Sequence, residues 1–240
     1  MASVSSRIPH IHLLCVADEF IVAFKKAAAE HGVYSLTSVE IHDCALSTLP
    51  ASVQFDTIVS PANSYGRLDG GFDDAISRAF SPRDDYLALT RAAQTELYEE
   101  WRGFAPPGTC TLLRIPESFR DRSRNIWGAK HLALCPTMRV PMNVTWDREI
   151  VYDTIWSLLC AIDKHNRLAQ VNSPDEKISS ILMTPMATGT GFVSADRWAH
   201  QTVLAIKHFI EALDDPAKWS GLTWHDIFDT ANEVEKTWSP

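Results

Sequence analysis

The sequence predicts an α/β protein: a three-layer α/β/α sandwich around a mixed, mostly parallel central sheet. Short apolar runs alternate along the chain with longer segments in which apolar residues recur at helical spacing. Alternation of this kind is typical of a sheet that helices cover on both faces. The 240 residues are 45% hydrophobic and 22% charged, and no linker divides them, so we expect one large domain with a full core.

The first part of the chain is expected to supply three strands and a helix. The strands fall at residues 10–16, 34–41 and 55–60. Between the first two, apolar side chains at helical spacing predict a helix over 19–31, which ends at Gly32. Residues 42–54 are expected to form a loop that contains Asp43.

The middle of the chain contains a strong signal for a helix start. Ser81 is suited to be the N-cap and Pro82 the first helical residue, and two acidic residues follow in the first turn. We expect this helix to run to about Trp101. Strands are then predicted at 109–115 and 129–134.

The last elements complete the predicted sheet. A helix with apolar residues on one face is expected over 146–168, followed by a polar turn over 172–177. A final buried strand at 178–184 precedes a helix that begins near Ser194. Together these elements predict one domain over residues 8–213.

Residues 214–240 are expected to form a C-terminal extension. Trp219, Trp224 and Phe228 belong to an apolar patch within it. We expect a short helix that docks on the domain, because aromatic stripes usually pack within their own protein. Contact with a partner is the alternative.

Composition limits the classes of partner. The net charge of −8 disfavours binding to bulk nucleic acid or to anionic membranes. No run approaches the ~18 apolar residues of a membrane span, and the first residues lack the apolar core of a signal peptide. We therefore expect a monomeric cytoplasmic protein, with a nuclear location left open.

The cysteines and histidines show no metal-binding spacing. The five cysteines form no C-x-x-C pair and are expected to be reduced and mostly buried. Among the nine histidines, His10 and His12 share one face of a strand, but a pair of this kind is more often structural than metal-binding. We expect no metal site and no cofactor.

Residues 58–76 carry the first functional signal. They run from a short apolar strand through a polar turn with Gly70 and Gly71 into an amphipathic helix. The first N–H groups of a helix have no partner within it, so such a junction can bind an anion. The two glycines let the backbone approach a ligand closely.

Residues 181–192 repeat this arrangement near the end of the domain. An apolar strand leads into a loop with Gly189 and Gly191, and a helix follows. Ligands of parallel α/β sheets bind beyond the carboxyl ends of the strands, where both loops would emerge. A diphosphate held between two sets of backbone amides is the natural ligand.

In the order of their side chains, these two loops resemble the ligand loops of the macrodomain family, which binds ADP-ribose. The resemblance covers about residues 10–213 and is strongest in the two loops. It implies a macrodomain-like domain that binds ADP-ribose or a derivative. Hydrolysis of a mono-ADP-ribosyl ester or of ADP-ribose 1″-phosphate is the favoured activity, so an ADP-ribosylated protein is one implied partner. The alternative is a non-catalytic reader or sensor.

The resemblance also implies roles for individual residues. Asn63 would contact the distal ribose and Asp73 would orient or activate water, whereas Asp43 would receive the adenine amine and Phe192 would stack on the ligand. Each has an alternative: a turn asparagine, a helix-start carboxylate, a surface acid and a core aromatic, respectively. The catalytic candidates are Asn63 and Asp73, and the ligand-binding candidates are Asp43, Ala62, Asn63, Gly70, Gly71, Phe72, Thr188, Gly189, Thr190, Gly191 and Phe192.

The first loop departs from the family pattern. Many members have asparagine and alanine where Ser60 and Pro61 stand, and a longer glycine run where Leu68 and Asp69 stand. These changes put the catalytic assignment in more doubt than the binding assignment. The sequence fits a nicotinamide-dependent dehydrogenase poorly. Gly189 and Gly191 follow the last strand, and no second strand that ends in an acidic residue comes about 20 residues later. The Walker lysine pattern is absent as well.

Overall fold

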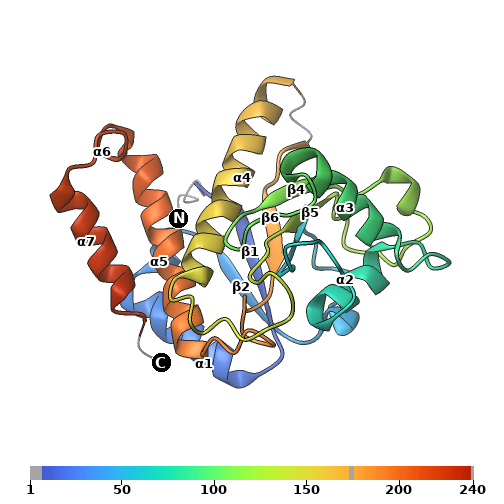
Figure 1. The fold of residues 1–240 in the computed structure, drawn as a ribbon, viewed down its shortest axis with the longest axis horizontal. Coiled ribbons are helices and arrows are strands. Elements are labelled where there is room, and N and C mark those ends of the chain that lie inside the picture. Colours follow the sequence, from blue (N-terminus) through green and yellow to red (C-terminus); the bar gives the residue numbers. More distant parts are fainter. Residues whose placement is uncertain (1–6, 173–175, 239–240) are drawn as a thin grey trace.

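A computed structural model describes residues 7–172 and 176–238 (Figure 1). Six strands form one sheet: β1 His10–Cys15, β2 Val39–Asp43, β3 Thr57–Ser60, β4 Thr111–Arg114, β5 His131–Leu134 and β6 Ser180–Met183. Their order is β2-β1-β6-β3-β5-β4. All neighbouring pairs are parallel except β4 with β5. The predicted mixed, mostly parallel sheet is therefore confirmed.

Helices cover both faces of this sheet. They are α1 Asp18–Glu30, α2 Gly71–Phe80, α3 Ala88–Trp101, α4 Ile150–Asn172, α5 Ala195–Asp214, α6 Pro216–Trp219 and α7 Trp224–Glu235. One core joins α1, α4 and α5 to the sheet, and a second core joins α2 and α3 to the opposite face (Figure 1). The predicted three-layer sandwich is confirmed.

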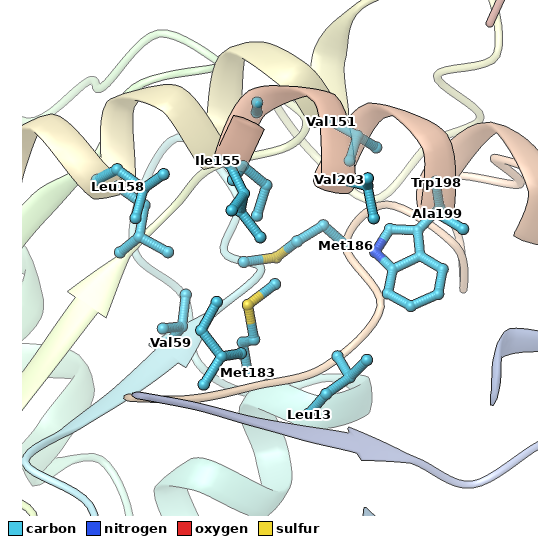
Figure 2. Close-up of a cluster of buried hydrophobic side chains, with 14 of the residues drawn as sticks. Leu13, Val59, Val151, Ile155, Leu158, Met183, Met186, Trp198, Ala199 and Val203 are labelled. Carbon is cyan, nitrogen blue, oxygen red and sulfur yellow. The ribbon is translucent and has the colours of Figure 1, made fainter. Parts of the chain in front are cut away.

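The larger core forms because alternate strand residues point to the same face. Leu13, Val59 and Met183 extend from three strands toward α4 and α5, and Ile155 and Val203 extend toward them from those helices (Figure 2). All are almost completely buried. Full burial of one such side chain contributes about 1.5–3 kcal/mol, so this layer fixes the positions of the central strand ends.

The second strand begins later than its sequence indicates. Residues 34 and 35 belong to a 3-10 turn, Val33–Ser35, that follows the left-handed Gly32 (φ 68°). The Ser35 hydroxyl donates to the Gly32 carbonyl at 2.7 Å. Local bonds of this kind compete with strand pairing, so the expected strand over 34–41 is wrong at its start. Asp43 ends the strand rather than lying in the loop.

The helix expected to start at Pro82 begins only at Ala88. Residues 82–87 form turns, with the Asp85 N–H donating to the Pro82 carbonyl at 3.0 Å. Ser81 still serves the helix, because its hydroxyl accepts from the Leu89 N–H at 3.2 Å. The sequence therefore identified Ser81 correctly as a capping residue. It predicted that the helix starts at Pro82, whereas the helix starts at Ala88.

Both ends of the fourth helix also differ from their expected positions. The helix expected over 146–168 is α4, which begins and ends four residues later. Its later start follows a turn in which the Asp147 N–H donates to the Val144 carbonyl at 3.0 Å. The polar turn expected over 172–177 includes residues 173–175, which lie outside the described part of the chain. None of the helices in that described part is both long enough and apolar enough to cross a membrane.

The C-terminal extension lies along α5 (Figure 1). Trp219 stacks on Trp156 of α4, with ring centroids 5.6 Å apart. Trp224 and Phe228 stack on each other instead, and they are 72% and 57% exposed. Only part of the expected apolar patch is therefore covered, and residues 239–240 lie outside the described range.

All five cysteines are free. Cys15 and Cys135 are buried, Cys44 and Cys110 are partly exposed, and Cys160 is exposed. The expectation of reduced thiols agrees with this arrangement, but burial is less complete than the apolar sequence context indicated.

Candidate functional site

A cleft of about 350 Å³ opens at the carboxyl ends of β3, β5 and β6. These strands are neighbours at the centre of the sheet, where the chain reverses its strand order. Such positions are the usual ligand sites of parallel α/β sheets. Three segments line the cleft: Pro61, Asn63, Arg67, Asp69, Gly70, Gly71, Phe72 and Asp73; Thr137, Met138 and Pro141; and Thr184, Pro185, Ala187, Thr188, Gly189, Thr190 and Gly191.

Most of the candidate residues meet here. The cleft wall includes Asn63, Gly70, Gly71, Phe72, Asp73, Thr188, Gly189, Thr190 and Gly191. They come from two loops that are far apart in sequence and are brought together because β3 pairs with β6. The roles of these residues remain predictions, whereas their common location is observed.

Three candidates lie outside the cleft wall. Asp43 is exposed at the end of the edge strand β2. Ala62 is buried, and its carbonyl accepts from the Thr137 N–H at 3.0 Å. Phe192 is 67% exposed, so the alternative of a core aromatic beneath the loop is wrong.

The start of α2 supplies the first set of backbone donors. Gly71 adopts a left-handed conformation (φ 55°), which allows the chain to turn from the loop into the helix. The N–H groups of Asp73 and Asp74 both donate to the Gly70 carbonyl. Among the described residues, the N–H groups of Gly71 and Phe72 have no acceptor and are free to bind an anion.

The second loop supplies another set. It is closed by two bonds: the Phe192 N–H donates to the Gly189 carbonyl at 3.0 Å, and the Val193 N–H to the Ala187 carbonyl at 3.1 Å. Ala187 and Phe192 both have left-handed backbones, with φ of 59° and 58°. In the described chain no carbonyl accepts from the four N–H groups between these residues, which line the cleft. Strain at both ends of a loop is typical of binding sites.

The two glycines of this loop, Gly189 and Gly191, have different structural roles. A Cβ at Gly189 would meet no atom within 4 Å, so only a ligand would limit that position. A Cβ at Gly191 would lie 2.3 Å from the Ala187 carbonyl oxygen. Gly191 is therefore required by the loop itself, whereas Gly189 is not.

Asp73 lies at the buried side of the cleft. Its side chain accepts a bond from the Ser60 hydroxyl at 2.6 Å, and only 7% of the residue is exposed. Burial raises the pKa of Asp73 to about 7, against an ordinary value of 3.8. In the sequence, Ser60 was identified only as a departure from the macrodomain pattern. A hydroxyl at the end of a buried strand can nevertheless orient a neighbouring carboxyl group.

Asp74 is the contrasting neighbour. It accepts from Arg78 Nε at 2.7 Å and from the Tyr86 hydroxyl at 2.6 Å. These bonds lower the pKa of Asp74. Asp74 thus has the partners expected of an ordinary first-turn carboxylate, whereas Asp73 is buried beside a ligand-sized cleft.

The raised pKa of Asp73 predicts a pH dependence of stability. Between about pH 4 and 7 the folded chain retains a proton that the unfolded chain releases, so the free energy of unfolding falls as pH rises. Relative to Asp73→Asn, the wild-type protein should lose on the order of 2–4 kcal/mol across this window and little beyond it. Denaturant titrations of both proteins at several pH values measure the difference. If the free energies of unfolding of the two proteins change in parallel with pH, the pKa of Asp73 is close to its ordinary value.

Asn63 is engaged by its own loop. Its Oδ1 accepts from the N–H groups of Tyr65 at 3.1 Å and Arg67 at 3.4 Å, and its Nδ2 donates to the Arg67 carbonyl at 2.8 Å. This is the geometry of a turn asparagine, which was the alternative to ribose contact. One amide hydrogen of Nδ2 remains for a ligand.

Sequence reasoning missed the third wall. Thr137, Met138 and Pro141 follow β5 just as the two recognised loops follow β3 and β6. The Met138 carbonyl accepts from the Ser64 N–H at 3.0 Å, which ties this wall to the first loop. Position after a central strand was the available signal, since the segment has no glycine motif.

No protein-family model matches the sequence, and no curated protein matches it. Solved structures of an Oceanobacillus iheyensis macrodomain are similar to it. The structure with ADP has 20% identity and a TM-score of 0.48, covering 65% of this chain and 70% of that one. A mutant with ADP-ribose has 17% identity and 0.48, covering 65% and 72%, and the protein with MES bound has 19% and 0.47, covering 66% and 71%. A likeness at this level decides nothing about the function of the chain.

Proposed function

We propose that the protein is a macrodomain-like binder of ADP-ribose or a derivative, and that the ligand occupies the cleft above β3, β5 and β6. One observation carries this proposal: two glycine-bearing loops, each with unpartnered backbone N–H groups in the described chain, line the same cleft. Those groups suit a diphosphate. The resemblance of the loop sequences to macrodomain ligand loops supports ADP-ribose in particular.

The charge and size of the site support a compact anionic ligand. The net charge of −8 disfavours long polyanions, but neutral backbone donors bind phosphate whatever the total charge. Arg67 is engaged by Asp69, its Nε donating at 2.9 Å, so the diphosphate would depend chiefly on the amides. A volume of about 350 Å³ is within the usual range for small-molecule sites.

Hydrolysis of a mono-ADP-ribosyl ester or of ADP-ribose 1″-phosphate is the favoured reaction. Asp73 would orient or deprotonate the attacking water, and the Ser60 hydroxyl would hold its carboxyl group in place. A pKa of about 7 leaves the side chain partly ionised near neutral pH, which suits a general base. Asn63 would contact the ribose through its remaining amide hydrogen.

A non-catalytic reader of ADP-ribosylated proteins is the second candidate. The bonds between Asn63 and its own loop favour it, because they leave the side chain little capacity to hold a reacting ribose. Both candidates bind the ligand, and only the first turns it over. Incubation with mono-ADP-ribosylated protein and with ADP-ribose 1″-phosphate, followed by measurement of released product, separates them.

Binding itself is tested by thermal unfolding with added ADP-ribose. At a concentration about 100-fold above its dissociation constant, a ligand adds ~2.7 kcal/mol to stability. For a chain of 240 residues this raises the melting temperature by roughly 5–10 °C. ADP-ribose should produce that rise, and an unchanged melting temperature would count against the proposal.

Asp43 is predicted to select adenine. A carboxylate can accept from the exocyclic amine of adenine, and Asp43 ends β2, one strand before β3, which leads into the first loop. Asp43→Ala should weaken ADP-ribose binding. It should also reduce the difference in affinity between ADP-ribose and its inosine analogue, as measured by competition. Asp43 lies on the edge strand and outside the cleft wall. If the difference in affinity is unchanged in the variant, Asp43 is a surface acid that does not contact adenine.

A further inference from the structure

Four potential metal ligands gather on one face of the sheet, away from the cleft. In the parallel register of β1 and β2, His12 lies opposite Glu40 and Leu14 lies opposite His42. Residues two apart along a strand share a face, so His10 joins His12 and His42 joins Glu40. Sequence reasoning considered only the two histidines of β1, because the register that adds the other two side chains is not visible in a single strand.

The donor atoms of these side chains are close together. His12 Nδ1 lies 3.0 Å from His42 Nε2. The Oε2 atom of Glu40 lies 3.7 Å from His12 Nδ1 and 3.8 Å from His10 Nε2, and Oε1 lies 3.9 Å from His42 Nε2. Tetrahedral Zn²⁺ with bonds of about 2.0–2.1 Å places its ligand atoms roughly 3.3 Å apart. The ligand atoms of His10, His12 and Glu40 all lie within 4.8 Å of one another, and His42 joins this group beside His12 and Glu40.

The surroundings favour a cation. All ion-pair partners of Glu40 within the described chain are these three histidines, and no lysine or arginine competes for its carboxylate. The His12 and His42 side chains are only 9% and 10% exposed, and His10 and Glu40 are more open.

We propose that His10, His12, Glu40 and His42 bind a divalent transition-metal ion of the zinc class, and that this ion links the edge strand β2 to β1. Imidazole nitrogen with one carboxylate oxygen is a donor set that suits Zn²⁺. In the sheet, β2 has β1 as its one neighbour, so an ion held by both strands stabilises the folded chain over the unfolded one. The described residues that line the cleft include none of these four ligands, so the ion would act on stability and not on the cleft.

A second group, Glu30, His31 and His200, is a weaker candidate and a useful control. It offers three donors, with His31 Nε2 lying 3.3 Å from His200 Nδ1. Lys207 lines the same cavity, and its positive charge opposes a bound cation. We assign the ion to the four-donor group for these reasons.

Calorimetric titration of the full-length, chelator-treated protein with ZnSO₄ tests the proposal. We expect one saturable equivalent, a rise in melting temperature of roughly 5–10 °C at saturation, and a tetrahedral absorption spectrum when Co²⁺ replaces Zn²⁺. Glu40→Gln and His10→Ala alter the two more exposed ligands, so both should fold. Each should weaken binding at least about 10–100-fold, the cost typical of losing even an outer-shell partner. His31→Gln should leave the affinity unchanged.

Two results would overturn the assignment. One is the absence of saturable Zn²⁺ binding by the wild-type protein. The other is retention of affinity in both Glu40→Gln and His10→Ala, which would place any bound ion elsewhere, at the His31 group if His31→Gln abolishes binding. Melting temperatures measured without metal show that each variant is folded.

Discussion

The Gly189→Val variant is expected to fold like the wild-type protein and to lose the stabilisation that ADP-ribose should provide. No atom lies within 4 Å of a Cβ at this position, so valine meets no obstacle from the chain itself. Its methyl groups would instead occupy space beside the unpartnered amides of the second loop. The expected result is loss of the whole ligand-induced rise in melting temperature, roughly 5–10 °C.

The control for this substitution is Gly221→Val. Gly221 lies between α6 and α7, and a Cβ there would make an ordinary contact of 3.6 Å. This variant should keep the full response to ADP-ribose. Gly191 is unsuitable for the comparison, because its substitution would clash with the loop backbone. An undiminished response in Gly189→Val would show that the second loop does not hold the phosphates.

Asp73→Asn is expected to lower turnover at least about 100-fold while ADP-ribose affinity changes little. A positioned general base typically contributes ~10²–10⁴-fold in rate. Asparagine keeps the size of the side chain and an oxygen that can accept from Ser60, so the cleft should be preserved. Single-turnover rates with both substrates, together with a binding isotherm, provide the comparison.

Asp74→Asn is the matched control for that experiment. The two residues are adjacent on α2, but Asp74 bonds to Arg78 and Tyr86 and not to Ser60. Its loss should cost only about 0.3–1 kcal/mol of stability and leave turnover near the wild-type rate. Equal losses of turnover in the two variants would assign the effect to the start of α2 as a whole. If the wild-type protein binds the ligand but does not turn it over, the proposed function as a non-catalytic reader of ADP-ribosylated proteins is favoured.

The strands and the two loops could be predicted because they depend on local pattern. Buried parallel strands are short and mostly apolar, as in 57–60 and 180–183, and glycines mark the turns that follow. The start of the helix after Ser81 could not be predicted, since a capping serine acts through space and its partner N–H lies eight residues later. Local pattern specifies which elements occur better than it specifies where they begin.

The candidate site was predictable in its two loops and not in its details. Gly189 and Gly191 look alike in the sequence, and only the position of the Ala187 carbonyl distinguishes them. Asp73 and Asp74 also look alike, and which of them is buried depends on the rotation of α2 against the sheet. Burial and register are properties of the assembled layers, so a single sequence does not reveal them.

Isothermal titration calorimetry of the wild-type protein with ADP-ribose tests the central claim most directly. The account predicts saturable binding of one ligand per chain, abolished in Gly189→Val and intact in Gly221→Val. Heat that does not exceed dilution, from a protein shown to be folded by circular dichroism, would contradict it.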